Sequence, residues 1–396
     1  MPLSRDGLAR LHDTMAARVD AGELPGLVLL VAAGDDVHVE AIGAPAFTAE
    51  TALRSDAIFR IASLTKPVVA AAALTLVEEG RLRLEDPIDD LVPELAGRRV
   101  LRSLDAELDD TVPARRAITL ADLLDFRLGF GAVMAMPGTY PIQVAEAELQ
   151  LQSISGPPWP PGPHDPDSWI AALGTLPLIY QPGEVWLYNT GTQVLGILLA
   201  RACGHDLGTV LRERIFEPLG MADTGFWVPP DRIDRLTTFY LPDGETGELS
   251  VLDEPADSWW AAPPRHPDAS GWLVSTADDY WAFVSMLLAG GGGVLAPETV
   301  ALMSADRLTP AQREPYPMFF GDHGSWGLGL SVPAAGAGDQ PFPTGVGWDG
   351  GSGVTWRSQP TRTASGILLT QRHAMSPAPT PLVQDFWAGV NAATRD

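Results

Sequence analysis

The chain has 396 residues, of which 45% are hydrophobic and 8% aromatic, so it is long enough to bury a large core and to fold as two lobes. Its formal net charge of −24 disfavours nucleic acid and anionic membranes as partners, because their phosphate groups would be repelled. No apolar run reaches the ~18 residues that a membrane span needs. The single cysteine, Cys203, excludes an internal disulfide and fits a reducing compartment.

The first predicted elements are a helix and a β-hairpin. Residues 4–21 place apolar side chains on one face of a helix, and Gly22 follows its end. This amphipathic start carries charged residues and lacks the apolar centre of a signal peptide, so we expect a cytoplasmic protein. Two strand-like runs, 26–33 and 37–42, are joined by a short turn and predict a hairpin.

The middle of the chain predicts helices separated by long loops. One helix ends at Glu79, and Ser63 lies at or beside its start because Pro67 is tolerated only in the first turn. Residues 155–169 hold six prolines and predict irregular structure, either the wall or lid of a pocket or a surface loop. Further helices are predicted over 120–127, 190–203, 207–216 and 277–289.

The last part of the chain predicts strands again, over 326–332, 353–357 and 365–372, followed by a closing helix over 381–390. Strands at both ends of the chain with helices between them indicate an α+β fold. We expect one α/β lobe, an antiparallel sheet flanked by helices, built from residues 1–80 and 320–396. Residues 81–319 are then a mainly helical inserted lobe, and the catalytic cleft lies between the two lobes.

Lys66 is the only lysine in the chain, so all the other basic residues among the 26 Lys+Arg are arginines. Arginine stays protonated in proteins and cannot act as a base, whereas a lysine amine can lose its proton. Lys66 follows Ser63 at i+3, so the two side chains lie on one helix face. A serine hydroxyl becomes a good nucleophile when a neighbouring base accepts its proton. The pair therefore indicates nucleophilic catalysis, although this spacing alone is a weak motif.

Two further motifs follow in order. Residues 182–189 read Pro-Gly-Glu-Val-Trp-Leu-Tyr-Asn and place Tyr188 just before an apolar helix. Residues 347–351 read Gly-Trp-Asp-Gly-Gly and allow a strand to approach a substrate closely. With Ser63 and Lys66, these motifs make the chain resemble the class C β-lactamase-like serine hydrolases, and most closely the family VIII carboxylesterases. The resemblance implies the serine β-lactamase/DD-peptidase-like fold.

The same resemblance implies a role for each motif residue. Ser63 matches the acylated nucleophile, Lys66 its partner amine, and Tyr188 the tyrosine that exchanges protons with the nucleophile and the leaving group. How the base role divides between Lys66 and Tyr188 stays open. The backbone N–H groups of Ser63 and Gly351 match the oxyanion hole, in an alignment that sets residues 348–350 on the lysine-threonine-glycine triplet of β-lactamases.

The predicted substrate-binding positions depart from a β-lactamase. Trp348 stands where the triplet lysine helps to hold the lactam carboxylate, Asp349 adds a negative charge, and Gly350 completes the triplet. Asn189 and Thr190 follow the tyrosine, with the asparagine one place earlier than usual. These departures resemble the esterase branch and predict an apolar wall for an uncharged acyl group or alcohol.

We therefore expect a serine esterase that forms an acyl-enzyme and acts on a small-molecule ester or amide, with no cofactor and no metal. An acyltransferase, a D-aminopeptidase or amide hydrolase, and a β-lactamase are alternatives that use the same residues. The alternative of another class is a binding or scaffold protein that accepts an acyl group without turnover. The physiological substrate and the oligomeric state are not determined by the sequence.

Overall fold

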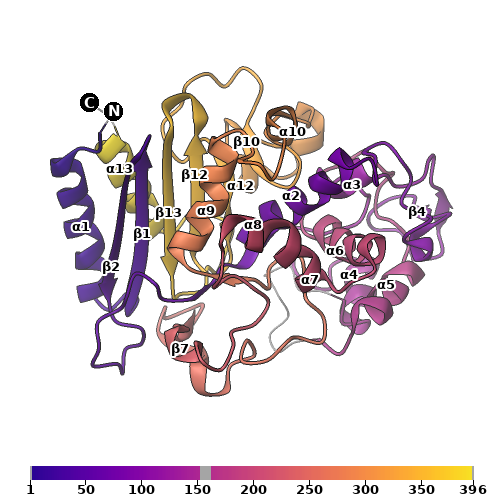
Figure 1. Ribbon diagram of the computed structural model, residues 1–396. Coiled ribbons are helices and arrows are strands. Elements are labelled where there is room, and N and C mark those ends of the chain that lie inside the picture. Colours follow the sequence, from indigo (N-terminus) through magenta and orange to yellow (C-terminus); the bar gives the residue numbers. More distant parts are fainter. Residues whose placement is uncertain (1, 152–161, 395–396) are drawn as a thin grey trace.

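A seven-stranded antiparallel sheet is the largest layer of the computed structural model, which describes residues 2–151 and 162–394 (Figure 1). The strand order is β2-β1-β13-β12-β11-β10-β9, so the N-terminal hairpin pairs with the last strand of the chain. Strands from both ends of the chain thus form one sheet, and the predicted α+β fold is confirmed. The strands of this sheet are β1 (Gly26–Ala33), β2 (Asp36–Gly43), β9 (Gly324–Trp326), β10 (Ser331–Pro333), β11 (Val346–Gly350), β12 (Val354–Gln359) and β13 (Ala364–Thr370).

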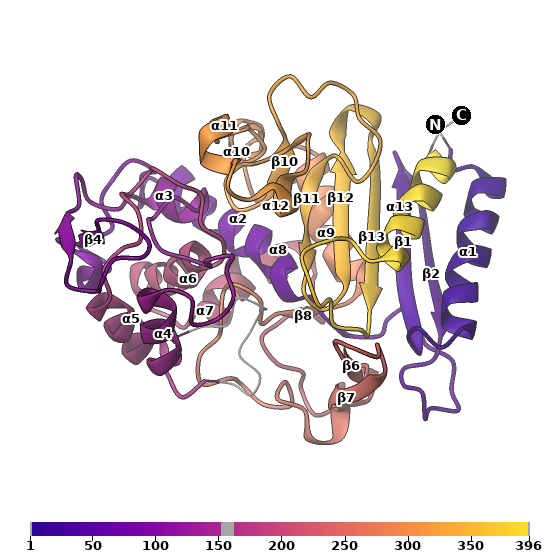
Figure 2. The same cartoon turned by 180° about the vertical axis from the view of Figure 1, so that it is seen from behind.

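Helices cover both faces of the sheet. Alternate side chains of β1 point to opposite faces, and both sets are apolar and buried. Leu27 and Leu29 pack in a cluster with α1 (Arg5–Asp20) and α13 (Pro381–Thr394), whereas Val28 and Leu30 face the main core. On that second face, α9 (Ala277–Leu288) packs against β1 and β13. Figure 1 shows α9 in front of the strands, and the view from behind in Figure 2 shows α13 in front of them. Residues 81–319, which were predicted to form only the inserted lobe, therefore also supply a layer to the sheet.

The remaining helices lie mainly to one side of the sheet (Figure 1). They are α2 (Thr65–Glu78), α3 (Leu120–Leu124), α4 (Pro141–Glu148), α5 (Pro166–Thr175), α6 (Thr190–Cys203), α7 (Leu207–Leu211), α8 (Glu217–Leu219), α10 (Pro297–Met303), α11 (Pro310–Arg313) and α12 (Pro317–Phe320). Three small pairs complete the strands: β3 (Phe59–Arg60) with β8 (Val274–Ser275), β4 (Arg99–Leu101) with β5 (Thr111–Pro113), and β6 (Phe239–Pro242) with β7 (Leu249–Asp253). Among the described residues no single helix is long and apolar enough to cross a membrane; only the bent pair formed by residues 190–203 and 207–219 meets that test.

Two segments differ from the sequence prediction. The run 326–332 is two short strands, because β9 ends at Trp326 and Gly329, at φ 83°, turns the chain before β10 begins. The end of the proline-rich run 155–169 is helical, because Pro166 begins α5 and proline is well suited to the first helical position. Residues 155–161 of that run lie outside the described residues.

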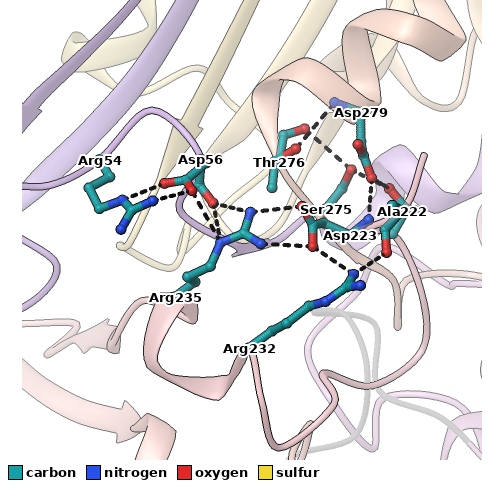
Figure 3. A network of polar contacts seen from close by, with 10 residues as sticks. Arg54, Asp56, Ala222, Asp223, Arg232, Arg235, Ser275, Thr276 and Asp279 are labelled. Carbon is teal, nitrogen blue, oxygen red and sulfur yellow. Dashed lines mark hydrogen bonds and ion pairs between the residues drawn. The ribbon is translucent and has the colours of Figure 1, made fainter. Parts of the chain in front are cut away.

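A polar network joins the loop 222–235 to the start of α9 (Figure 3). The guanidinium of Arg235 lies 2.7 Å from the Asp223 carboxylate and donates to the backbone carbonyl of Asp56. Asp279, in the first turn of α9, accepts a hydrogen bond from the Asp223 N–H at 2.7 Å. Because Asp56 shortly precedes β3, the network also anchors the segment that leads into α2.

Candidate active site

Ser63 lies where the chain passes from β3 into α2. Ala62, the residue before it, has φ 43°, a left-handed conformation that costs about 1 kcal/mol in a residue with a side chain. The Thr65 hydroxyl donates to the Ala62 carbonyl at 2.7 Å and so holds this turn. Ser63 is 9% exposed and lines a cavity of about 510 Å³. The turn therefore presents the serine to a space that a small molecule can enter.

Lys66 is fully buried beside Ser63. Its Nζ donates to Ser63 Oγ at 2.9 Å and to the backbone carbonyl of Ser270 at 2.6 Å. Burial lowers the pKa of Lys66 to about 7, and the nearby Asp268 carboxylate opposes part of that effect. A substantial fraction of the amine is therefore neutral near neutral pH and able to accept a proton.

Tyr188 reaches Ser63 from the segment just before α6. Its hydroxyl donates to Ser63 Oγ at 2.8 Å and accepts a hydrogen bond from Trp348 Nε1 at 3.0 Å. Burial raises the pKa of Tyr188 to about 12, although the hydrogen bonds with Ser63 and Trp348 act in the opposite direction. The phenol is therefore protonated at neutral pH. Lys66 Nζ lies 4.6 Å from the centre of the tyrosine ring.

Asn189 joins Tyr188 to α6 through a strained turn. Its backbone has φ 84° and ψ −60°, and the Thr190 N–H donates to the Tyr188 carbonyl at 3.2 Å, which is the geometry of a γ-turn. Asn189 lines the cavity. Thr190 is 2% exposed in the first turn of α6 and lies outside the cavity lining. The structure thus brings Asn189, but not Thr190, to the other predicted site residues.

The strand β11 approaches Ser63 closely because Gly350 has no side chain. A Cβ at Gly350 would lie 2.7 Å from the Ile61 carbonyl oxygen and 3.2 Å from the Ala62 Cβ. Gly351 follows and lines the same cavity as Ser63. Within the described part of the chain, neither the Ser63 N–H nor the Gly351 N–H donates to another backbone carbonyl. Both are available to a bound oxygen atom.

Asp349 is paired, a feature that the sequence reading missed. Its Oδ2 accepts a hydrogen bond from Arg357 Nη2 at 2.6 Å, and its Oδ1 accepts one from the Thr355 hydroxyl at 2.6 Å. The negative charge that the sequence places at this position is therefore paired with a cation on β12. Thr355 and Arg357 alternate along β12, so both side chains lie on one face of that strand. This pattern predicts the contact with Asp349 only when the register of β11 and β12, which pairs Asp349 with Thr355, is already known.

Aromatic side chains form the wall that was predicted beside Trp348. The Trp348 ring packs edge-on against Trp326, with 4.6 Å between ring centroids, and stacks with Phe319 at 6.0 Å. Phe319 also stacks with Tyr188 at 5.0 Å. Phe319 belongs to α12, a single turn that no pattern in the sequence had indicated. Trp348 is only 3% exposed, so its surface is packed inside the protein, in contact with these aromatic rings and with Tyr188.

A serine within hydrogen-bond distance of a buried lysine and a tyrosine, beside strand β11 of a helix-covered antiparallel sheet, defines the class of serine β-lactamase-like proteins. The Beta-lactamase family profile matches residues 11–382. The chain belongs to the Beta-lactamase family, and the resemblance found in the sequence is confirmed. At this level it is a serine hydrolase or acyltransferase of that family.

Individual relatives cover nearly the whole chain. Protein Rv1367c of Mycobacterium tuberculosis (strain ATCC 25618 / H37Rv) is 39% identical over 367 residues, which cover 89% of this chain and 87% of the relative. Esterase EstB of Burkholderia gladioli is 28% identical over 389 residues, 90% of each chain. The solved structure of EstCE1, described as a hydrolase with promiscuous acyltransferase activity, superposes with a TM-score of 0.79 at 22% identity, over 97% of this chain and 98% of that chain.

Proposed function

We propose that this protein is a serine esterase that cleaves small carboxylic esters with uncharged acyl groups. The observation that carries the proposal is the position of Ser63 Oγ, within hydrogen-bond distance of both Lys66 Nζ and the Tyr188 hydroxyl. The resemblance to β-lactamases sets Trp348 in place of the lysine that helps to hold the lactam carboxylate, and Trp348 lines the cavity beside Ser63. The name of the relative EstB, an esterase, supports the same reading.

In the acylation step, the neutral amine of Lys66 accepts the proton of Ser63 as Oγ attacks the ester carbonyl. The ordering of the two pKa values, about 7 for Lys66 and about 12 for Tyr188, favours the lysine as this base. The N–H groups of Ser63 and Gly351 stabilise the developing oxyanion. Tyr188 donates its proton to the departing alkoxide and becomes a phenolate, which the Trp348 N–H and the Lys66 ammonium stabilise.

In deacylation, the phenolate of Tyr188 accepts a proton from the attacking water. The Lys66 ammonium returns its proton to Ser63 Oγ as the carboxylic acid leaves. The cycle restores all three side chains to their starting protonation states.

An alcohol in place of water would make the same site an acyltransferase. The cavity volume of about 510 Å³ favours this second candidate, because it leaves room for an acceptor beside an acyl chain. The description of EstCE1 as a hydrolase with acyltransferase activity points the same way.

The decisive experiment compares substrates on the purified protein. A chain-length series of p-nitrophenyl esters, a chromogenic cephalosporin and D-amino-acid amides would be measured beside the Ser63→Ala variant. We expect the highest kcat/KM for an ester, loss of turnover in Ser63→Ala, and loss of most activity in Lys66→Arg, which keeps the charge but cannot act as a base. A cephalosporin or amide as the best substrate would overturn the esterase proposal. A single burst that ends in a stable adduct would instead indicate an acyl-accepting binding protein.

A further inference from the structure

The acceptor that holds Lys66 belongs to a segment packed along the first turn of α2. Besides the contact from Lys66 Nζ to the Ser270 carbonyl, the Leu273 N–H donates to the Thr65 hydroxyl at 3.2 Å. The Ile61 N–H donates to the Leu273 carbonyl at 2.9 Å. Residues 270–273 therefore form a fixed edge against which the lysine amine is placed.

Asp268 closes the turn that leads into this edge. Its Oδ1 accepts a hydrogen bond from the Ser270 N–H at 2.7 Å, and its Oδ2 accepts one from Gln193 Nε2 at 3.1 Å. The backbone carbonyl of Asp268 accepts from the Trp272 N–H at 3.1 Å. Asp268 is 6% exposed, so these contacts are made away from water. The carboxylate thereby orients Ser270, whose own carbonyl receives the lysine.

The helix α6 supports the same turn. A Cβ on Gly196 would lie 2.6 Å from the Ala269 Cβ, so α6 and the turn are in close contact. Gln193, the partner of the Asp268 carboxylate, lies on the same helix, which begins directly after Tyr188 and Asn189. Helix α6 therefore contacts the turn that holds Lys66 and also follows directly after Tyr188 and Asn189.

We propose that Asp268 is a positioning residue for Lys66: its carboxylate fixes the turn whose carbonyl holds the amine against Ser63, and its buried negative charge stabilises the ammonium form. The inference rests on the proposed function in one respect, namely that Lys66 acts as the base.

The electrostatic surroundings of Lys66 support this role. Burial lowers the pKa of Lys66 and the charge of Asp268 raises it. Other titratable groups lie near this pair. Burial lowers the pKa of His266, and the charge of Asp268 opposes part of that effect. Burial raises the pKa values of Tyr188 and of Tyr280, whose hydroxyl donates to the Leu64 carbonyl at 3.1 Å. Asp349, on β11, is paired with Arg357. Removing the charge of Asp268 should therefore lower the pKa of Lys66 further.

The single lysine makes a direct test possible. Protein labelled with ¹³C at the lysine Cε carries one such side chain, so its NMR titration reports the pKa of Lys66 alone. We expect a midpoint near 7 in the parent, a lower midpoint in Asp268→Asn, and a midpoint close to the parent in Asp268→Glu, which keeps the charge. Asp122→Asn is the matched control, because Asp122 is also buried and closes a turn through the Thr119 N–H at 2.9 Å, but lies in α3.

Measurements of kcat/KM separate the effect of Asp268 on the position of Lys66 from its effect on the Lys66 pKa. Asp268→Glu should lose about tenfold in the high-pH plateau of kcat/KM, because the longer side chain moves the carboxylate away from the Ser270 N–H. Asp268→Asn should keep a plateau closer to that of the parent, because its amide oxygen can still accept this hydrogen bond. An unchanged Lys66 midpoint in folded Asp268→Asn would overturn the electrostatic part. A parent-like plateau in Asp268→Glu would overturn the positioning part, and this variant also serves if Asp268→Asn does not fold. Should no ester be hydrolysed while the midpoints move as expected, the proposed function fails and the link between Asp268 and Lys66 stands.

Discussion

Trp348 has two roles at the residue scale. Its ring belongs to the aromatic wall of the cavity, and its N–H donates to the Tyr188 hydroxyl at 3.0 Å. A hydrogen bond to a group that becomes charged during the reaction contributes more to the charged state than to the neutral one. In the proposed mechanism, this N–H stabilises the phenolate form of Tyr188.

Replacing Trp348 with phenylalanine tests that second role. The variant keeps an aromatic ring but removes the donor, so we expect kcat/KM for the best ester to fall by about tenfold or more, with a smaller effect on KM. Trp356→Phe is the control, because Trp356 is buried directly opposite on β12 and its Nε1 donates to the Ser358 hydroxyl at 2.8 Å, away from Tyr188. Equal losses in both variants would mean that packing, not the hydrogen bond, matters.

The buried amine of Lys66 lowers the stability of the folded state. Because its pKa falls from 10.5 to about 7 on folding, the folded protein binds fewer protons between these values, and stability rises with pH over that window. Below this window the buried amine costs on the order of 5 kcal/mol of folding free energy. Lys66→Met should therefore unfold at a higher temperature at about pH 6, and the gain should shrink by about pH 10. Thermal unfolding at both pH values measures this, and a gain that grows with pH would contradict it.

At the scale of elements, a buried ion pair joins β3 to β7 just before the nucleophile. Arg60 pairs with Asp253, and both side chains are at most 3% exposed. The Arg60 guanidinium also donates to the Thr237 carbonyl at 2.7 Å and lies 4.8 Å from the ring centroid of Trp260. The short strand that leads into Ser63 is therefore held by charge, hydrogen bonding and an aromatic ring together.

Breaking this pair should be costly. Asp253→Asn leaves the buried guanidinium without its counter-charge, so we expect a loss of roughly 3–5 kcal/mol in the free energy of unfolding. In the control Asp110→Asn, the pair with Arg102 is more than half exposed and the expected loss is below about 1 kcal/mol. Denaturant unfolding of the two variants gives the comparison, and similar losses would show that burial does not decide the effect.

At the scale of the whole molecule, the net charge of −24 produces repulsion among surface carboxylates. Salt screens such repulsion between charges that lie farther apart than the Debye length, which is about 10 Å at 0.1 M. The melting temperature should therefore rise by a few degrees as NaCl is increased from about 0.01 to 0.3 M. The same rise in KCl would indicate screening, whereas a rise in only one of the salts would indicate binding of a particular ion.

Patterns between residues that are close in the sequence were enough to predict part of the fold and of the site. The lone lysine at i+3 from Ser63, the N-terminal hairpin, and the helices that begin at capping residues all depend on neighbours within a turn or two, where steric and hydrogen-bonding preferences act directly. The motif order around Tyr188 then indicated the family.

Other features were decided only by the tertiary structure. The pairing of Asp349 with Arg357 depends on strand register, and the bond from Trp348 to Tyr188 joins residues 160 positions apart. Asp268 and Lys66 are linked through Ser270, whose N–H donates to the Asp268 carboxylate and whose carbonyl accepts from Lys66 Nζ, 204 positions away along the chain. Local preferences carry no information about such distances, because packing of the sheet and helices brings these groups together and the buried environment then sets their charges.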